Sequence, residues 1–481
     1  MSEKSSIKIS ARAFISSLII LLALIIAAGA LTYIIPSGSF ERIETDGHLC
    51  IVPDTFEFSE RGGYPVWRWF TAPIEVLWSS DAVTVISIII FIFMIGGVFT
   101  VLDKCGMLHY IMSLLVRRFS ASKYKLMAIL VLFFMLFGSV FGIFEELVAL
   151  VPIVIVLSLA LGWDSLVGLG MSALAACFGF ASATLNPFTL GVAQSVAGLP
   201  MFSGLLFRII VLILSYALLF AFLYTYARKI EKDPTRSHIY AEDSFTREKY
   251  SDINTLDKLP NEKELSLTVK IFAASILLVI LYVVVGFFFP LLSSYSMVAM
   301  ALLFLIGGLV GGAVSNYGGN VLKDFAAGIA GIAPSAILIL MAMSVKLIIT
   351  NGEIIDTILY YISSSISSMG QYGAVIMIYL VVLVLNFFVA SGSAKAFLLM
   401  PLITPLSELV GLNTQIAVQA FCFGDGFTNI LYPTNPLLMI TLGITVVSYP
   451  KWFKWTLPLQ LMMLILNIAI LCFAVFIGYG A

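Results

Sequence analysis

Long apolar runs constrain the fold of this chain more than any other feature of its sequence. Five of them are each long enough, as helix, to cross about 30 Å of hydrocarbon: residues 13–34, 82–101, 268–289, 294–314 and 455–478. They must be helical, because lipid offers no hydrogen-bonding partner to backbone amides. Since 60% of the residues are hydrophobic and 11% are charged, the sequence predicts an all-α polytopic membrane protein.

Charge and cysteine content exclude other classes of protein. The net charge of −1 argues against a nucleic-acid partner. The five cysteines show neither a disulfide framework nor metal-ligand spacing, so no cofactor is expected. The first apolar run lacks a small-residue cleavage site and is expected to remain as an anchor. Lys4, Lys8 and Arg12 precede it, which places the N-terminus in the cytoplasm.

A segment of the chain occurs twice, 249 residues apart. Residues 151–163 read VPIVIVLSLALGW, and residues 400–412 read MPLITPLSELVGL. In this register identical residues coincide: Pro152 with Pro401, Ser158 with Ser407, Gly162 with Gly411, Asn186 with Asn435 and Pro187 with Pro436. Two membrane halves, each with a helix interrupted at Asn-Pro, are typical of a secondary transporter with a site at the membrane midplane.

The positions of Lys and Arg predict the topology. Residues 37–81 are expected to be an extracytoplasmic loop, and the basic stretch 229–267 a cytoplasmic linker. All basic clusters face the cytoplasm only if residues 124–161 and 371–410 each enter and leave on the same side, as re-entrant hairpins. Two ordinary spans per hairpin are the alternative, which leaves one set of basic residues outside.

Counting the crossings then divides the chain. Because unit one starts outside and unit two starts inside, the repeats are inverted. The expected parts are an N-terminal span (1–36), repeat unit one (82–228) with a hairpin at 124–161 and a broken helix at 163–198, two scaffold spans (268–324), and repeat unit two (325–478) with a hairpin at 371–410 and a broken helix at 413–447. The short pieces 106–119 and 352–368 are expected to lie at the membrane interface.

The two hairpin turns carry different chemistry. The first holds Glu145 and Glu146, of which one is expected to bind a cationic group or a coupling ion, or else to cap a helix. The second holds a Ser-Gly-Ser turn at a helix start, which suits a carboxylate. Lys395 follows it, either to bind substrate or to neutralise a carboxylate across the interface. The residues of the second turn are Ser391, Gly392 and Ser393.

The broken helices supply the remaining candidates. Pro187, Pro433 and Pro436 free backbone carbonyls at membrane depth. Asp425 is expected to be a proton carrier, a sodium ligand or a partner of a substrate ammonium, or alternatively to pair with Lys395 or cap a helix. Aligning residues 178–180 with 423–425 instead shifts the register by four. Neutral side chains near the breaks are further ligand candidates: Thr184, Asn186, Asn429, Thr434 and Asn435. Gln194, Gln415 and Gln419 are weaker candidates, and Arg208 is expected to snorkel to the interface.

Four motifs, in order, carry a family resemblance: GSVFGIFEE, ATLNPFTLGVAQSVAGLP, SGSAKAFLLMPL and FGDGFTNILYPTNP. They resemble the YfcC-like branch of the C4-dicarboxylate anaerobic carrier family, within the wider ion transporter superfamily. Members are prokaryotic inner-membrane carriers, labelled either basic amino-acid (arginine/ornithine) antiporters or C4-dicarboxylate carriers. The resemblance covers nearly the whole chain.

The resemblance implies a homodimer in which a mobile transport domain moves elevator-fashion against a scaffold domain. It also implies substrate and Na⁺ at the hairpin tips and helix breaks, with Na⁺ near Asn186 and Asn435. Residue by residue, it points to Ser139, Gly142, Glu145, Asn186 and Pro187 in unit one, and to Ser391, Gly392, Ser393, Asp425, Asn429, Thr434 and Asn435 in unit two. Dicarboxylate carriers of the superfamily show Ser-Asn-Thr at their hairpin tips, which these turns lack, and Glu145 stands there instead.

The sequence therefore predicts a secondary active transporter, a symporter or exchanger coupled to Na⁺ or H⁺, for a small charged metabolite such as a basic amino acid. A carrier of C4-dicarboxylates or other carboxylates is the alternative. A channel and a membrane-embedded enzyme are more remote. A GxGD protease needs Gly where Cys422 stands, and His48, His109 and His238 form no HExxH motif.

Overall fold

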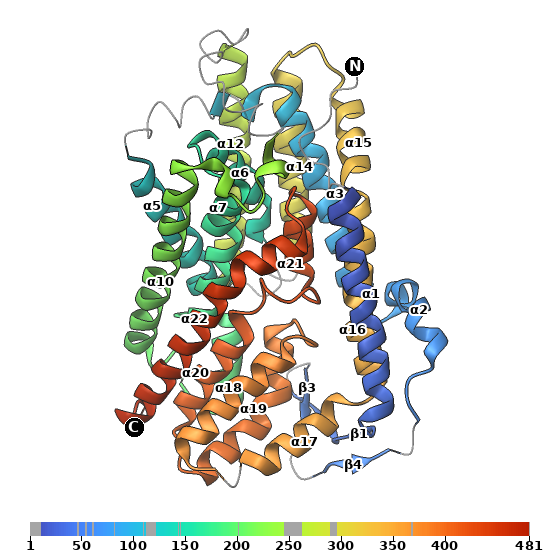
Figure 1. Cartoon of the computed structure of the whole chain (residues 1–481), viewed down its shortest axis with the longest axis vertical. Coiled ribbons are helices and arrows are strands. Elements are labelled where there is room, and N and C mark those ends of the chain that lie inside the picture. Colours follow the sequence, from blue (N-terminus) through green and yellow to red (C-terminus); the bar gives the residue numbers. More distant parts are fainter. Residues whose placement is uncertain are drawn as a thin grey trace.

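Figure 1 shows the computed structural model, a bundle of helices with small strands at one end. It describes residues 11–480 except 46–47, 53–54, 60–61, 81, 109, 112–121, 143, 145, 201, 245–261, 289–295 and 367–368. Most of the expected interfacial piece 106–119 and the linker residues 245–261 therefore lie outside the described part.

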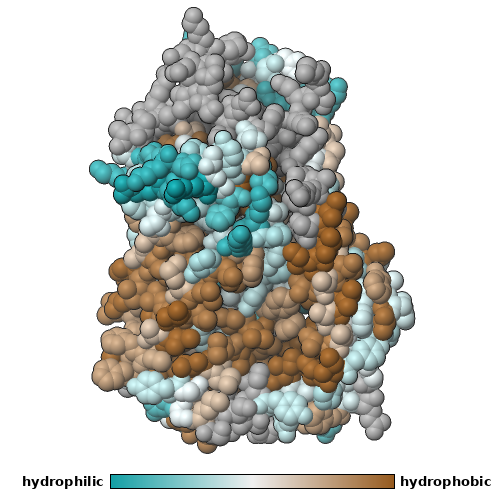
Figure 2. All heavy atoms as spheres, viewed as in Figure 1, coloured by the Kyte–Doolittle hydropathy of each residue, from teal (hydrophilic) through white to brown (hydrophobic). Residues whose placement is uncertain are grey.

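Long apolar helices dominate the described residues. Five are long and apolar enough to cross a membrane: Val85–Lys104, Lys123–Phe141, Ser165–Ser182, Leu205–Lys232 and Tyr449–Phe476. A sixth candidate is the pair α15 (Val321–Ile332) and α16 (Pro334–Asn351), which is bent by 42°. Pro334 at the bend cannot donate a backbone hydrogen bond, which accounts for the break. Figure 2 shows the corresponding hydrophobic band, with hydrophilic residues above and below it.

One group of helices packs through small residues. Helix α14 (Ser296–Val314) lies against α12 (Glu262–Phe288) and α3 (Ala82–Lys104), and α1 (Ala11–Ile34) lies against α16. A Cβ at Gly307 would come within 2.2 Å of Ser275 Oγ, and one at Gly308 within 2.2 Å of Val98 Cγ1. These glycines let the helices approach closely, as small residues do in membrane bundles.

The expected hairpins each consist of two helical arms. In unit one, α5 (Lys123–Leu136) and the wide helical turn Phe137–Phe141 are followed, past a break, by the short turn Glu146–Leu150 and α6 (Val151–Ala160). In unit two, α18 (Gln371–Leu385) is followed by α19 (Gly392–Leu409). The arms α6 and α18 are shorter than the roughly 20 residues that a spanning helix needs, whereas α5 together with its wide turn, Lys123–Phe141, is long enough to cross a membrane.

The ends of α6 and α19 are built identically. Trp163 N donates to Ser158 O over 3.0 Å, and 249 residues later Leu412 N donates to Ser407 O over 2.8 Å. Gly162 and Gly411 have φ of 85° and 69°, the left-handed conformation that ends helices and suits glycine. The repeated sequence therefore forms the same local structure twice.

Both broken helices resume at Asn-Pro. In unit one, the first half-helix is Ser165–Ser182. It consists of α7 (Ser165–Leu169), a wide turn and α8 (Ala175–Ser182). The second half consists of the turn Pro187–Gly191 and α9 (Val192–Val196). In unit two, α20 (Thr414–Gly426) precedes α21 (Pro436–Gly443). The first half-helix has 18 residues in unit one and 13 in unit two. In unit two a longer connection, 427–435, makes up for the shorter half-helix before the chain reaches Asn-Pro. The repeat register is therefore not uniform through these helices.

The described part of the linker contacts unit one. Helix α10 (Leu205–Lys232) extends into the range expected to be linker. Asp164 Oδ2 then accepts hydrogen bonds of 2.7 Å from Tyr226 and from Ser237. Asp243 accepts 2.7 Å from Ser165 N, at the first residue of α7. The linker residues 233–244 are thus attached to the start of the broken helix. The last long helix is α22 (Tyr449–Phe476).

The prediction of an all-α chain is wrong for residues 38–58. Strand β1 (Gly38–Ser39) pairs antiparallel with β4 (Glu57–Phe58), and β2 (Arg42–Thr45) pairs antiparallel with β3 (His48–Ile51). Arg42 forms a 2.7 Å ion pair with Asp356, on α17 (Ile355–Ile366). This distant contact holds β2 against α17. Residues 66–78 form α2 (Val66–Glu75) and a further turn, Val76–Trp78.

Candidate functional site

The first half-helices of the two units end against each other. A Cβ at Gly426 would lie 2.3 Å from Ala181 Cα. Phe178 and Phe427, which coincide in the repeat, pack edge to face with ring centroids 5.1 Å apart. Cys177 Sγ donates to Gly426 O over 3.2 Å. The two helix breaks are therefore neighbours, and the side chains that follow them gather in one region.

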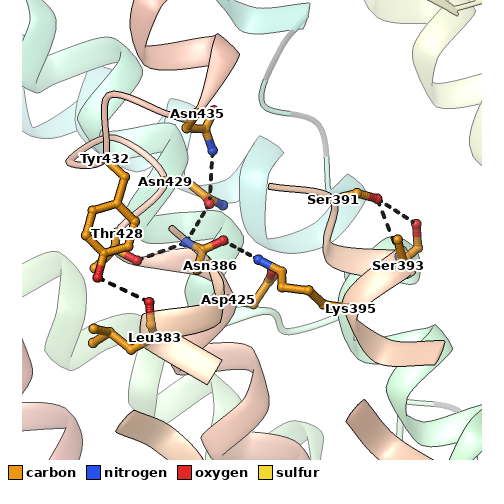
Figure 3. A network of polar contacts seen from close by, with 12 residues as sticks. Leu383, Asn386, Ser391, Ser393, Lys395, Asp425, Thr428, Asn429, Tyr432 and Asn435 are labelled. Atoms are coloured by element: carbon orange, nitrogen blue, oxygen red, sulfur yellow. Dashed lines mark hydrogen bonds and ion pairs between the residues drawn. The ribbon is translucent and has the colours of Figure 1, made fainter. Parts of the chain in front are cut away.

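A network of amides connects the break of unit two with the hairpin of unit two (Figure 3). Asn386, directly after α18, donates from Nδ2 to Thr428 Oγ1 and to Asn429 Oδ1, each over 2.9 Å. Asn435 Nδ2 donates to the same Asn429 oxygen over 3.1 Å. Because all four side chains are nearly or fully buried, these bonds satisfy groups that would be costly to leave unpaired.

A buried ion pair lies beside this network. Lys395 Nζ is 2.6 Å from Asp425 Oδ1, and neither side chain is exposed. The same ammonium donates to Asn386 Oδ1. Of the alternatives that the sequence left open for Asp425, the ion pair with Lys395 is the one that this conformation contains. The pair is neutral as a whole, which reduces the cost of burying either charge.

The start of α19 lies on the other side of Lys395. Ser391 is exposed, and its Oγ accepts from Ala394 N over 3.4 Å, which caps the helix. Ser391 Oγ and Ser393 Oγ are 3.5 Å apart. Figure 3 shows both hydroxyls on the same side of the helix start. Helix α19 has 18 residues, so its first turn presents a positive dipole end next to these hydroxyls.

Thr434 and Asn435 both form hydrogen bonds within the protein. Thr434 Oγ1 donates to Phe387 O, which joins the connection 427–435 to the hairpin turn. Asn435 Oδ1 accepts from Leu437 N over 2.9 Å and caps α21. In unit one Asn186 Oδ1 accepts from Phe188 N over 2.9 Å. The Asn-Pro motif is therefore a helix cap in both units.

The hairpin of unit one meets its broken helix through hydroxyls. Ser139 Oγ lies 2.9 Å from Thr184 Oγ1 and accepts from Thr184 N over 3.0 Å. Gly142 has φ of 65°, and a Cβ there would lie 2.2 Å from Asn186 Oδ1. Glycine is therefore required at this turn for both conformation and space.

The acidic turn is only partly described. Glu145 lies outside the described residues, and the structure describes the backbone of Glu146 but not its side chain. The predicted roles of both glutamates stay predictions.

The expected snorkelling of Arg208 is wrong. Its side chain is fully buried and donates to Ser203 O and, over 3.2 Å, to Gln415 Oε1. Gln194 Nε2 donates to the same oxygen over 3.0 Å. Arg208, Gln194 and Gln415 thus form one polar cluster. The side chain of Gln419, one turn further along α20, has no hydrogen-bonding partner among the described residues. The charge of Arg208 early in an apolar helix indicated the interface, but the packing of α20 buries it.

Asn386 and Thr428 are site residues that the sequence analysis missed. Asn386 ends a 15-residue apolar arm in the string NFFVASGSAK, and this single amide after an apolar run was the available signal. Thr428 lies between Asp425 and Asn429. Its position in an irregular connection gave no periodic pattern to interpret.

Comparison with known proteins identifies the family to which the chain belongs. The sequence profile described as "DcuC: C4-dicarboxylate anaerobic carrier" matches residues 14–476. The chain belongs to the C4-dicarboxylate anaerobic carrier family. Within this carrier family, it is 32% identical to an Escherichia coli (strain K12) protein named "Putative basic amino acid antiporter YfcC", with 96% of each chain covered. It is 28% identical to an uncharacterized Haemophilus influenzae protein, with 93% of this chain and 94% of that protein covered.

The expected resemblance is confirmed, and the carrier is a multi-pass membrane transporter, not an enzyme. Two solved transporters also align over most of its length. The Alcanivorax borkumensis YdaH transporter is 18% identical with a TM-score of 0.42, covering 97% of this chain and 98% of its own. Neisseria gonorrhoeae MtrF is 18% identical with a TM-score of 0.39, covering 96% and 94%.

Proposed function

We propose that this carrier is a secondary active transporter of an amino acid, with basic amino acids as the preferred class. The name of the Escherichia coli relative supports this class. The observation that carries the proposal is the position of Ser391 and Ser393 beside a Lys395 that is already neutralised by Asp425.

The charge balance of this site favours one carboxylate over two. The amides and hydroxyls at the start of α19 bind a single substrate carboxylate. A second carboxylate would need a free cation, and the ammonium of Lys395 is occupied by Asp425 and Asn386. The ammonium of an amino acid, or its cationic side chain, is instead held by Glu145 or Glu146 at the turn of the other hairpin.

The architecture that we propose consists of inverted repeats at 82–228 and 325–478, with hairpins and broken helices that carry substrate against a scaffold. The identical caps at Gly162 and Gly411 and at the two Asn-Pro motifs support the repeat. We further propose an elevator-type movement, a homodimer, and insertion in a prokaryotic inner membrane with a cytoplasmic N-terminus.

The coupling ion is proposed to be Na⁺ or H⁺. For H⁺, Asp425 is the proton carrier, because protonation would release Lys395 from the pair. For Na⁺, backbone carbonyls within the connection 427–435 and the side chains of the break are the oxygen ligands, as hard cations prefer.

A ligand screen tests the substrate class. Binding to the folded state raises the melting temperature of the purified carrier by mass action. We expect arginine or ornithine to raise it in the wild type and not in S391A/S393A. The matched control is S244A, which removes an exposed serine hydroxyl far from the hairpin in sequence. A shift that persists in S391A/S393A, or no shift with any amino acid, contradicts the proposal.

A C4-dicarboxylate substrate is the second candidate. The description of the family and the ammonium of Lys395 at the hairpin favour it. It requires that substrate displaces Asp425 from Lys395. In the same screen it predicts that succinate or fumarate raises the melting temperature and that arginine does not.

A further inference from the structure

Arg208, in the first turn of α10, is a buried cation that no carboxylate neutralises among the described residues. Its side chain is fully buried. Its hydrogen bonds go to two neutral acceptors, the backbone oxygen of Ser203 and, over 3.2 Å, Oε1 of Gln415. The charge of the guanidinium is therefore not compensated within the described part of the chain, although burying an unpaired charge is costly.

The carboxylate of α20 does not supply the missing negative charge. Asp425 is 2.6 Å from Lys395, and that pair is neutral as a whole. Arg208, Lys395 and Asp425 are all fully buried and together carry a net charge of +1. A small anion beside Arg208 would balance this charge.

Gln419 is an unused hydrogen-bonding group on the helix that faces Arg208. It is fully buried, and neither its Oε1 nor its Nε2 has a partner among the described residues. Gln415, Gln419 and Cys422 follow one another at spacings of four and three residues, so they share one face of α20. Gln415 accepts from Arg208, and Cys422 interacts electrostatically with the guanidinium. This face of α20, with Gln419 at its middle, is therefore turned towards Arg208.

The guanidinium also has an unused donor. Nη1 and Nη2 of Arg208 donate to Ser203 and Gln415, whereas Nε is buried and has no partner among the residues that the structure describes. A guanidinium nitrogen and the Nε2 of a glutamine side chain can only donate. Two unused donors beside an uncompensated positive charge favour an acceptor that carries negative charge.

Tyr479 lies over the outer end of this cluster. Its hydroxyl donates to Gly204 O over 3.0 Å, and its ring stacks on Phe207 with centroids 4.2 Å apart. A Cβ at Gly204 would lie 1.9 Å from Tyr479 Oη and 3.3 Å from Arg208 Nη1. The glycine therefore lets the phenol approach the guanidinium. Because Arg208, Gln419 and Cys422 are buried beneath it, a single-atom anion suits this place better than a metabolite.

We propose that chloride binds between α10 and α20, held by the guanidinium of Arg208 and the amide nitrogen of Gln419. The anion neutralises Arg208 and joins the start of α10, in unit one, to α20, in unit two. It therefore stabilises the packing of the two units at this end of the helices. The site includes neither hairpin turn, so it does not depend on the proposed substrate.

Thermal shift of the purified full-length carrier tests the site, with sodium gluconate replaced stepwise by sodium chloride at constant ionic strength. The wild type is expected to show a saturable rise in melting temperature, which sodium bromide also produces. R208Q is expected to melt at the same temperature in all three salts. R236Q removes an exposed arginine of the linker. It is the matched control and is expected to titrate like the wild type.

Q419L separates anion binding from folding. The variant removes a buried amide that has no partner among the described residues, so its melting temperature in gluconate is expected not to fall. Half of the rise is expected to need at least about tenfold more chloride, because the anion loses a hydrogen bond. Q460L replaces a buried glutamine of α22 whose amide nitrogen also lacks a partner in the described part of the chain. It is expected to titrate like the wild type.

Bromide in crystals of the carrier locates the ion. Anomalous diffraction is expected to place it in contact with Arg208 and Gln419. Equal melting temperatures of the wild type in chloride and gluconate, an unchanged titration in Q419L, or a bromide peak that touches neither residue overturns the proposal. If R208Q does not fold, Q419L and the bromide peak decide. An equally weakened titration in Q460L also overturns it, because the effect then belongs to buried amides in general.

Discussion

Lys395 and Asp425 form a fully buried ion pair, with 2.6 Å between Nζ and Oδ1. Lys395 lies in the first turn of α19, and Asp425 lies in the last turn of α20. The pair therefore fastens the tip of the second hairpin to the place where the broken helix stops. In the proposed mechanism, substrate that moves through this site passes a contact between the hairpin and the broken helix.

The first prediction concerns the stability of this pair. K395M or D425N alone leaves one buried charge without its partner and should cost about 3–5 kcal/mol of folding free energy. The double variant K395M/D425N should recover most of this loss, because no unpaired charge remains. Chemical denaturation of the three proteins in detergent measures the coupling.

The surface pair Arg236–Asp233 is the control for that cycle. Its side chains are 61% and 43% exposed, so R236Q and D233N should each change stability far less than the variants of the buried pair, because solvent screens an exposed pair. Equal losses in the buried and the surface cycles would mean that the Lys395–Asp425 contact does not carry the stability assigned to it.

The second prediction concerns the Asn-Pro caps. N186A and N435A each remove a side-chain acceptor at a helix start and should cost about 0.5–2 kcal/mol. Both should also reduce transport, because the caps hold the breaks at the site. N320A removes the same kind of cap from α15, away from the breaks, and should lower stability without reducing transport. Equal transport in N435A and N320A would contradict this role.

The third prediction concerns pH. Partial burial, followed by the charges of Lys229 and Lys454, lowers the pKa of His238 below its usual value. The folded chain therefore prefers the neutral imidazole, which stacks on Tyr226. The stabilisation is complete above the unfolded pKa of about 6.5 and is lost as pH falls through the lower folded value.

Melting temperatures of wild type and H238Q across this pH range measure the effect. The wild type should lose more stability than H238Q as the pH is lowered below about 6.5. Parallel pH profiles for the two proteins would show that the linker around His238 does not stabilise the fold in the way described.

Local signals predicted much of the fold, and distant contacts account for what was missed. Gly162, Gly411 and the Asn-Pro motifs end or start helices through bonds within a few residues, so the sequence alone indicates them. The strands at 38–58 depend on Arg42 reaching Asp356, more than 300 residues away. No sequence pattern within residues 38–58 indicates that Asp356 is the partner of Arg42.

In the candidate site, too, the sequence predicted some features and not others. Its residue types were predictable, because polar groups in apolar runs are rare and costly. Their partners were not, because Asn386, Lys395 and Asp425 meet only when three separate helices pack together. Arg208 shows the same limit: its depth is decided by α20, which lies about 200 residues further along the chain.

Exchange in proteoliposomes tests the central claim most directly. Vesicles containing the purified carrier are loaded with unlabelled ornithine, and uptake of labelled arginine is followed, with succinate as competitor. We predict that arginine uptake requires the carrier and that succinate does not reduce it. In S391A/S393A the uptake should fall at least about tenfold, because the variant loses hydrogen bonds to the charged carboxylate of the substrate. Uptake of labelled succinate without uptake of arginine would contradict an amino-acid transporter and favour the dicarboxylate carrier.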